Sequence, residues 1–359
     1  MNATSAERST FTEHELLSTE PRLAPLIAGG VRCHGGFDAA GRYRSPRTVH
    51  RAPAVRAWQA RLEREGHALV SIPKSLVPPQ YPSVAQAKLL LSEGVREPIV
   101  RALTMVAIVE GFGAIIRDVK VPPLGAHVCE SIDGTALAHL ETLFEAHARD
   151  EAGHKDEGGH KQMWEAARDL ALDKPKIPGD VLLRMMGRRG GQRNVEKARL
   201  YPALDPALDR MLTTMANVLV IEVFATQTFD WGEQLLGDAE VSAAPAAAGA
   251  MVAHIRADEE PHVEYLRTAL SEVRARTLRT AEGGEVAGRI VVDALLDATL
   301  RALTTARPRD QRDETRASLA TAMREANKSD SLIEAFDALE SVWTPPPTTG
   351  FEPPAEARA

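Results

Sequence analysis

The sequence predicts an all-α protein, and three observations support this fold class. Aromatic residues make up only 4% of the 359 residues, whereas β-sheets are rich in aromatic and β-branched side chains. Alanine and leucine, which favour helices, are abundant through the centre of the chain. Long stretches there repeat apolar side chains at helical spacing. A chain of this length can bury a large core without disulfides.

Composition divides the chain into four parts. Residues 1–82 hold scattered prolines and glycine pairs, and they predict an irregular arm with one short helix at 53–65. Residues 83–278 predict a bundle of four long helices. Residues 279–341 predict additional helices, and the proline-rich residues 342–359 predict a disordered tail.

Proline and glycine residues separate the expected helices, since both interrupt helical structure. The first long helix is expected to break near Glu97 and Pro98, and Pro122 and Pro123 end it. The four long helices and the two additional ones are expected at 83–119, 134–172, 206–236, 243–278, 285–306 and 310–336.

Charge and cysteine usage narrow the classes of partner and the compartment. The net charge is -7, which argues against a nucleic-acid-binding surface. Cys33 and Cys129 form no paired motif, so a reducing cytoplasm is expected, and the first residues lack the pattern of a signal peptide. The most apolar stretch, 211–229, contains Asn217 and Gln227 and predicts a buried helix instead of a membrane span.

Two apolar helices each contain one isolated carboxylate. Glu110 is the only charged residue in 102–116, and Glu222 is the only one in 211–229. Burying an unpaired charge costs several kcal/mol, so such groups are normally paired or bound to a metal. Either metal ions or arginines from other segments can therefore be expected beside Glu110 and Glu222.

The other two long helices each contain a Glu-x-x-His motif. The first pairs Glu151 with His154, and the second pairs Glu259 with His262. Residues three apart face the same side of a helix, so each motif should present a carboxylate and an imidazole together. Four carboxylates and two imidazoles suit two divalent first-row metals.

Two isolated glutamates interleaved with two Glu-x-x-His motifs resemble the ligand set of the ferritin-like di-iron and di-manganese carboxylate superfamily. The resemblance covers about residues 83–278. It implies a ferritin-like four-helix bundle that binds two Fe ions or an Mn/Fe pair. It also implies that dioxygen is a reactant and that a separate partner donates electrons. The predicted metal ligands, which are also the predicted catalytic residues, are Glu110, Glu151, His154, Glu222, Glu259 and His262.

An additional histidine bears on the choice within this superfamily. His147 lies one turn before Glu151, and the resulting HxxxExxH motif resembles the arylamine N-oxygenases, although in that branch it lies on the last ligand helix. His147 is therefore a further candidate ligand, with an outer-layer or solvated histidine as the alternative. The small subunit of ribonucleotide reductase fits less well, because no tyrosine follows the first motif and Tyr265 follows the second.

Several other residues near the two motifs are not predicted to bind metal. His160 is expected at the surface, and the acidic residues beside the motifs, including Asp150 and Asp258, are expected to be mostly solvated, with one of them available to hold a ligand histidine. Pro261 predicts either a π-turn beside the ligands or a helix break. The basic loop at 187–193 predicts a solvated loop.

The expected function is therefore oxidative. The resemblance implies a cytoplasmic di-iron or Mn/Fe oxidoreductase that uses dioxygen to hydroxylate, N-oxygenate or desaturate a small organic substrate, with a homodimer as one candidate assembly. The first alternative is a ferroxidase or peroxide scavenger resembling ferritins and rubrerythrins. The second alternative is a metal-free helical scaffold that acts through partners.

Overall fold

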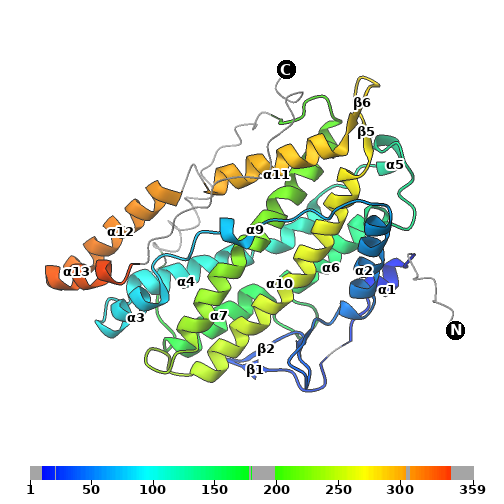
Figure 1. Cartoon of the computed structure of the whole chain (residues 1–359). Helices are drawn as coiled ribbons and strands as arrows, with labels where there is room; N and C mark the ends of the chain where they lie inside the picture. The colour runs from blue at the N-terminus through cyan, green and yellow to red at the C-terminus, as the bar shows by residue number, and fades with distance from the viewer. Residues whose placement is uncertain (1–9, 21, 178, 180–198, 305–307, 341–359) are drawn as a thin grey trace.

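The computed structural model describes residues 10–20, 22–177, 179, 199–304 and 308–340, and it is predominantly helical (Figure 1). The all-α prediction is confirmed at this level. Strands in the described residues form only short antiparallel hairpins. The predicted disordered tail at 342–359 and the basic loop at 187–193 lie outside the described residues.

The N-terminal arm is more structured than the sequence predicted. Its elements are α1 (Glu13–Leu16), β1 (Ile27–Ala28), β2 (Val31–Arg32), β3 (Gly36–Phe37), β4 (Tyr43–Arg44) and α2 (Thr48–Arg64). Phe11, Leu16 and Trp58 are buried, which fixes the arm against the helices that follow. Helix α2 begins before the expected residue 53, so Pro53 lies inside the helix.

The first predicted long helix is divided as expected near Pro98. Helix α3 (Val84–Ser92) is capped by Ser83, and α4 (Glu97–Glu110) carries Pro98 in its first turn. Helix α4 ends at Glu110 and not near residue 119. The 3-10 helix η2 (Gly113–Asp118) and α5 (Leu124–His127) follow it.

The second predicted long helix is divided in a way that the sequence analysis did not anticipate. The 3-10 helix η3 (Ala136–His139) leads into α6 (Leu140–Ala152), and α7 (His160–Ala171) begins after a short loop. Gly153 has φ 80°, a conformation that side-chain-bearing residues rarely adopt. A Cβ at Gly159 would lie 2.2 Å from the carbonyl oxygen of Glu151, so the loop folds back tightly on the end of α6.

The third and fourth predicted helices are present close to their expected bounds. Helix α9 (Pro206–Leu236) is capped by Asp205, and α10 (Pro245–Arg274) packs beside it along most of its length (Figure 1). Helix α10 continues as an α-helix through Pro261, so the expected π-turn or break is absent there. The remaining elements are β5 (Thr277–Arg279), β6 (Glu285–Ala287), α11 (Gly288–Thr304), α12 (Pro308–Glu325) and α13 (Asp330–Ala338).

The core consists of two apolar clusters along α9 and α10. One cluster includes Leu219 of α9 and Leu266 of α10, together with side chains of α6 and α11. The other includes Phe229 of α9 and Ile255 of α10, together with side chains of α4 and α7. Buried acidic and histidine side chains lie on α9 and α10 between these positions. A polar layer therefore separates two hydrophobic cores.

Two segments, 97–118 and α9, are long and apolar enough to cross a membrane by length and composition. Their mean hydropathies are 1.9 and 1.2, and 39% and 44% of their most apolar windows are buried in this structure. Core helices of soluble proteins meet the same criterion, and both segments contribute buried side chains to the clusters above. The absence of a membrane partner stays a prediction.

Candidate metal centre

The polar layer contains five of the six ligands predicted from the sequence. They are Glu110, Glu151, Glu222, Glu259 and His262, and each is buried. Glu110 comes from the last residue of α4, Glu151 from the last turn of α6, Glu222 from the middle of α9, and Glu259 and His262 from the middle of α10. Buried clusters of His, Glu and Asp at this point could hold metal ions.

His154 is not brought into this layer. Helix α6 ends at Ala152, so the three-residue spacing from Glu151 does not place His154 on the same helical face. Its side chain is partly exposed and belongs to none of the metal-capable groups found among the described residues. The predicted pairing of Glu151 with His154 requires a continuous helix, which Gly153 interrupts with its positive φ.

His147 and His160 occupy the layer instead. Both imidazoles are fully buried, so the expectation of a surface position for His160 is wrong. His160 is the first residue of α7, and the glycine-rich loop after α6 brings it back beside Glu151. Three glycines between Glu151 and His160 were the sequence signal for this reversal.

Among the described residues, the ligand-type atoms form four overlapping groups. Two of them are His34, His160 and Asp258, and Asp150, Asp258 and His262. The other two contain the predicted glutamates. In the first, atoms of His147, Glu151, Glu222 and His262 lie within 4.8 Å of one another. In the second, atoms of Glu110, Glu151 and His160 satisfy the same limit. Glu151 belongs to both groups, which is the position expected of a bridging carboxylate.

Glu259 connects the two groups from the other side. Its Oε1 atom lies 3.0 Å from Nδ1 of His160, and its Oε2 atom lies 2.8 Å from Nδ1 of His262. Each oxygen therefore faces a histidine of a different group. The two carboxylates Glu151 and Glu259 are suited to share two metal ions.

Two buried ring nitrogens support a metal-binding arrangement. Nε2 of His147 and Nδ1 of His160 are inaccessible to solvent and make no hydrogen bond. Nε2 of His147 lies 3.3 Å from Glu222, and Nδ1 of His160 lies 3.0 Å from Glu259 and 3.6 Å from Glu110. Buried polar atoms normally have partners, and a metal ion between the imidazoles and carboxylates would supply them. In the described contacts, Glu110 and Glu222 face histidines and not the arginines of the alternative interpretation.

The outer nitrogen of each buried histidine has a partner from another helix. Nε2 of His262 lies 3.2 Å from Asp150 on α6, and Nε2 of His160 lies 3.2 Å from Asp258 on α10. Each aspartate directly precedes a candidate ligand glutamate, so the two helices hold histidines across the centre. Such partners fix the orientation of the ring and the nitrogen that is free to bind a metal.

His147 has a different outer partner. Its Nδ1 atom lies 2.9 Å from the hydroxyl oxygen of Tyr265, which is fully buried on α10. Nε2 of His147 is then left for the carboxylates of Glu151 and Glu222. The rings of His147 and His262 stack with centroids 3.7 Å apart.

The N-terminal arm supplies the next layer of contacts. Arg47 Nε donates to Asp150 at 2.6 Å, and Arg51 Nη1 donates to the same carboxylate at 2.8 Å. His34 Nε2 lies 2.5 Å from Asp258 Oδ2. Both aspartates are fully buried and not solvated as expected, and sequence reasoning did not identify their three partners from the arm.

The carboxylates of the candidate centre differ in the direction of their pKa shifts. Burial raises the pKa of Glu110 to about 7 and raises that of Glu259 well above its ordinary value. Burial also acts on Glu151, but the histidines around it hold its pKa below the ordinary range. Burial lowers the pKa of His147, but the carboxylates of Glu151 and Glu222 raise it to about 9. Glu110, Glu259 and His147 therefore hold protons that cations would displace, because metal ligands must bind in the deprotonated form.

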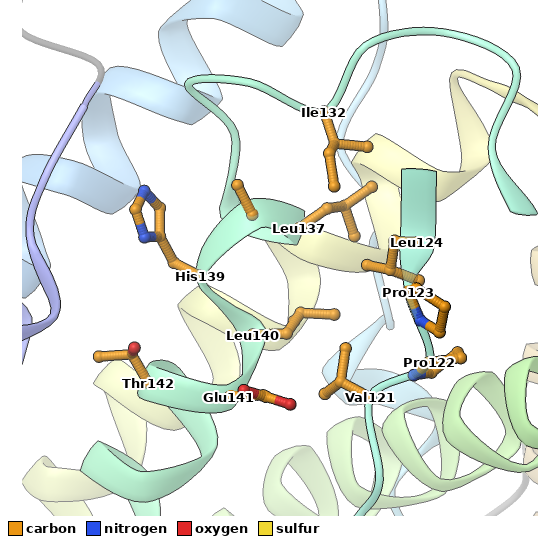
Figure 2. Close-up of a pocket in the computed structure, with 11 residues that line it drawn as sticks. Val121, Pro122, Pro123, Leu124, Ile132, Leu137, His139, Leu140, Glu141 and Thr142 are labelled. Atoms are coloured by element: carbon orange, nitrogen blue, oxygen red, sulfur yellow. The ribbon is translucent and has the colours of Figure 1, made fainter. Parts of the chain in front are cut away.

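A separate pocket lies away from this centre (Figure 2). Its volume is about 440 Å³, and it lies between the segment after η2 and the start of α6. It is lined by Val121, Pro122, Pro123, Leu124, Ile132, Leu137, Ala138, His139, Leu140, Glu141 and Thr142. None of the buried ligand-type residues described above lines it.

Comparison of the chain with protein-family models, curated proteins and solved structures found no significant match.

Proposed function

We propose that the chain is a ferritin-like di-metal carboxylate oxidoreductase that binds two Fe ions, or an Mn/Fe pair, and uses dioxygen to oxidise a small organic substrate. The observation that carries this proposal is that two ligand groups share Glu151, while the two oxygens of Glu259 each face a histidine of a different group. A single-metal site would not need a second set of carboxylates on the far side of these bridges.

The residues present fit two first-row divalent metals. Four carboxylates offer enough negative charge to balance two divalent cations, and three imidazoles favour transition metals over calcium or magnesium. We assign Glu110 and His160 to one metal and His147, Glu222 and His262 to the other, with Glu151 and Glu259 between them. The predicted role of His154 as a ligand is not part of this assignment.

Bound metals of this kind would supply the electrons for reduction of dioxygen. The chain's own groups set the conditions for that chemistry. Asp150 and Asp258 hold two histidine rings in position, and Arg47 and Arg51 offset the charge of Asp150. Burial of the centre keeps bulk water away from most of its ligands.

The test is oxygen consumption by protein loaded anaerobically with Fe(II). An electron donor and candidate substrates for hydroxylation, N-oxygenation or desaturation would be supplied in separate reactions. Repeated oxygen uptake that depends on an organic substrate and yields its oxidised product would support the proposal. Uptake driven by iron or peroxide alone, with no organic product, would instead assign the chain to the ferroxidase or scavenger class.

A further inference from the structure

The N-terminal arm contributes buried side chains to both outer aspartates of the candidate centre. Asp150 pairs with Arg47 and Arg51, and Asp258 contacts His34. All of these side chains are buried. Three side chains of the arm therefore reach the carboxylates that hold the candidate ligand histidines.

The backbone near His34 is fixed against the loop that leads to His160. The backbone N–H of Gly158 donates to the carbonyl oxygen of Arg32 at 2.8 Å. The neighbouring strands β1 and β2 contact α10 and α7, the helices that carry Asp258 and His160 (Figure 1). Main-chain contacts of the arm therefore place His34 at the centre.

Both ring nitrogens of His34 face hydrogen-bond acceptors. Nδ1 lies 3.1 Å from the carbonyl oxygen of Gly158, and Nε2 lies 2.5 Å from Oδ2 of Asp258. A histidine that faces two acceptors donates from both nitrogens and so carries a positive charge. His34 therefore offsets the charge of Asp258, as the two arginines of the arm offset the charge of Asp150.

Asp258 connects His34 to a candidate metal ligand. Its Oδ2 atom, which faces His34, also lies 3.2 Å from Nε2 of His160. With Nε2 donating to Asp258, the lone pair on Nδ1 of His160 is left for a metal beside Glu110 and Glu259. Loss of His34 would remove the shorter of these two contacts and leave the carboxylate free to turn away from His160.

We infer that His34 is a positioning residue that sets the metal affinity of His160 through Asp258. This inference rests on the proposed function, because it assigns a role in metal binding at the same centre. His34 holds the carboxylate, and the carboxylate holds the imidazole that binds the metal. The arm is then part of the metal centre and not only a cover over it.

Cobalt(II) binding to the full chain tests this role without turnover. Metal-free protein is titrated with cobalt(II) against a competing chelator, and the visible absorption bands of cobalt are recorded. His34→Leu is expected to weaken the binding of one of the two cobalt ions about tenfold, at the lower end of the loss typical for an outer partner of a ligand histidine.

Two further variants separate the hydrogen bond from the fold of the arm. His34→Gln keeps an N–H donor beside Asp258, so it should bind cobalt more tightly than His34→Leu does. Arg44→Gln is the control, because Arg44 is an exposed residue of the same arm that pairs with Asp38. This variant should bind cobalt as the parent does.

Proton NMR of the cobalt-loaded protein reports on the contact itself. The unpaired electrons of cobalt shift the ring N–H proton of a bound histidine away from other signals, and slow exchange with water shows that a partner holds this proton. His160→Ala identifies the signal of His160 by its loss. His34→Leu should speed the exchange of that proton and leave the ring protons of His147 and His262 unchanged.

The outcomes separate this inference from the proposed function. A parent chain that takes up no cobalt would overturn both. Two cobalt ions bound equally tightly by the parent and His34→Leu, or an equal loss in His34→Leu and Arg44→Gln, would overturn the inference alone. A third cobalt ion that His34→Leu removes would also overturn it, because His34 would then be a metal ligand.

His34→Gln carries the test if His34→Leu fails to fold. A neutral donor holds a carboxylate more weakly than a charged one does. Faster exchange of the His160 ring proton in His34→Gln than in the parent would therefore support the inference. The same exchange rate in both proteins would overturn it.

Discussion

Nδ1 of His160 lies 3.0 Å from Oε1 of Glu259, so the first residue of α7 meets the middle of α10 at the candidate centre. The same nitrogen of His160 lies 3.4 Å from Glu151 and 3.6 Å from Glu110. No helical spacing in the sequence connects these residues. The contact is made by the loop that reverses the chain after α6, and it places a third histidine among the carboxylates.

Substitution of His160 tests which histidine of this region binds metal. We expect His160→Ala to lose at least one metal ion per chain, because it removes a buried imidazole that faces three carboxylates. His154→Ala is the matched control and should keep the full metal content, because His154 lies beyond the end of α6. Metal content would be measured by elemental analysis after dialysis. If His154→Ala lost metal and His160→Ala kept it, the ligand set predicted from the Glu-x-x-His spacing would be correct.

Asp258 is predicted to tune metal affinity without binding metal. Its carboxylate contacts both His34 and His160, so Asp258→Asn should weaken the hold on the His160 ring. Loss of such an outer partner typically lowers metal affinity about 10–100-fold. Competitive titration with a chelator would measure this change. The control is Asp293→Asn, because Asp293 lies on the distant helix α11 and pairs with Arg274. This variant should leave metal affinity unchanged. An equal loss of metal affinity in both variants would refute the role assigned to Asp258.

Glu272 predicts a specific dependence of stability on pH. It is buried on α10, where it accepts hydrogen bonds from the backbone of Ala136 and Leu137, and burial raises its pKa from 4.5 to about 7. The folded chain then keeps a proton that the unfolded chain releases. The resulting stabilisation is complete below pH 4.5 and is lost as the pH rises to about 7.

Denaturant unfolding of Glu272→Gln and the parent at several pH values measures this effect. Relative to the variant, the parent should lose roughly 3 kcal/mol of unfolding free energy between pH 4.5 and about 7. Glu334→Gln, at an exposed position on α13, should track the parent. A constant difference between Glu272→Gln and the parent across this range would show that Glu272 titrates normally.

The sequence predicted those parts of the fold that depend on local pattern. Helices α9 and α10 were predicted close to their observed bounds, because proline and glycine residues delimit long apolar repeats there. The isolated glutamates Glu110 and Glu222 could be recognised because no other charge lies near them on their helices. Their burial in the polar layer follows from the apolar helices that carry them.

The missed features depend on chain reversals and long-range contacts. His160 could not be placed from spacing, because the loop through Gly153 and Gly159 replaces the expected helical turn. His34 and Arg47 reach the centre from an arm whose sequence predicts irregular structure. Such contacts are set by tertiary packing, and hydrophobic periodicity carries no information about them.

The central claim is that these residues form a di-metal centre, and metal content per chain tests it most directly. Protein produced with both iron and manganese available should contain about two metal ions per chain. The variant Glu222→Ala should lose metal while keeping its helical circular-dichroism signal, because its apolar helix no longer carries a buried charge. Parent protein without metal after reconstitution, or a Glu222→Ala variant that binds as much metal as the parent, would contradict the account.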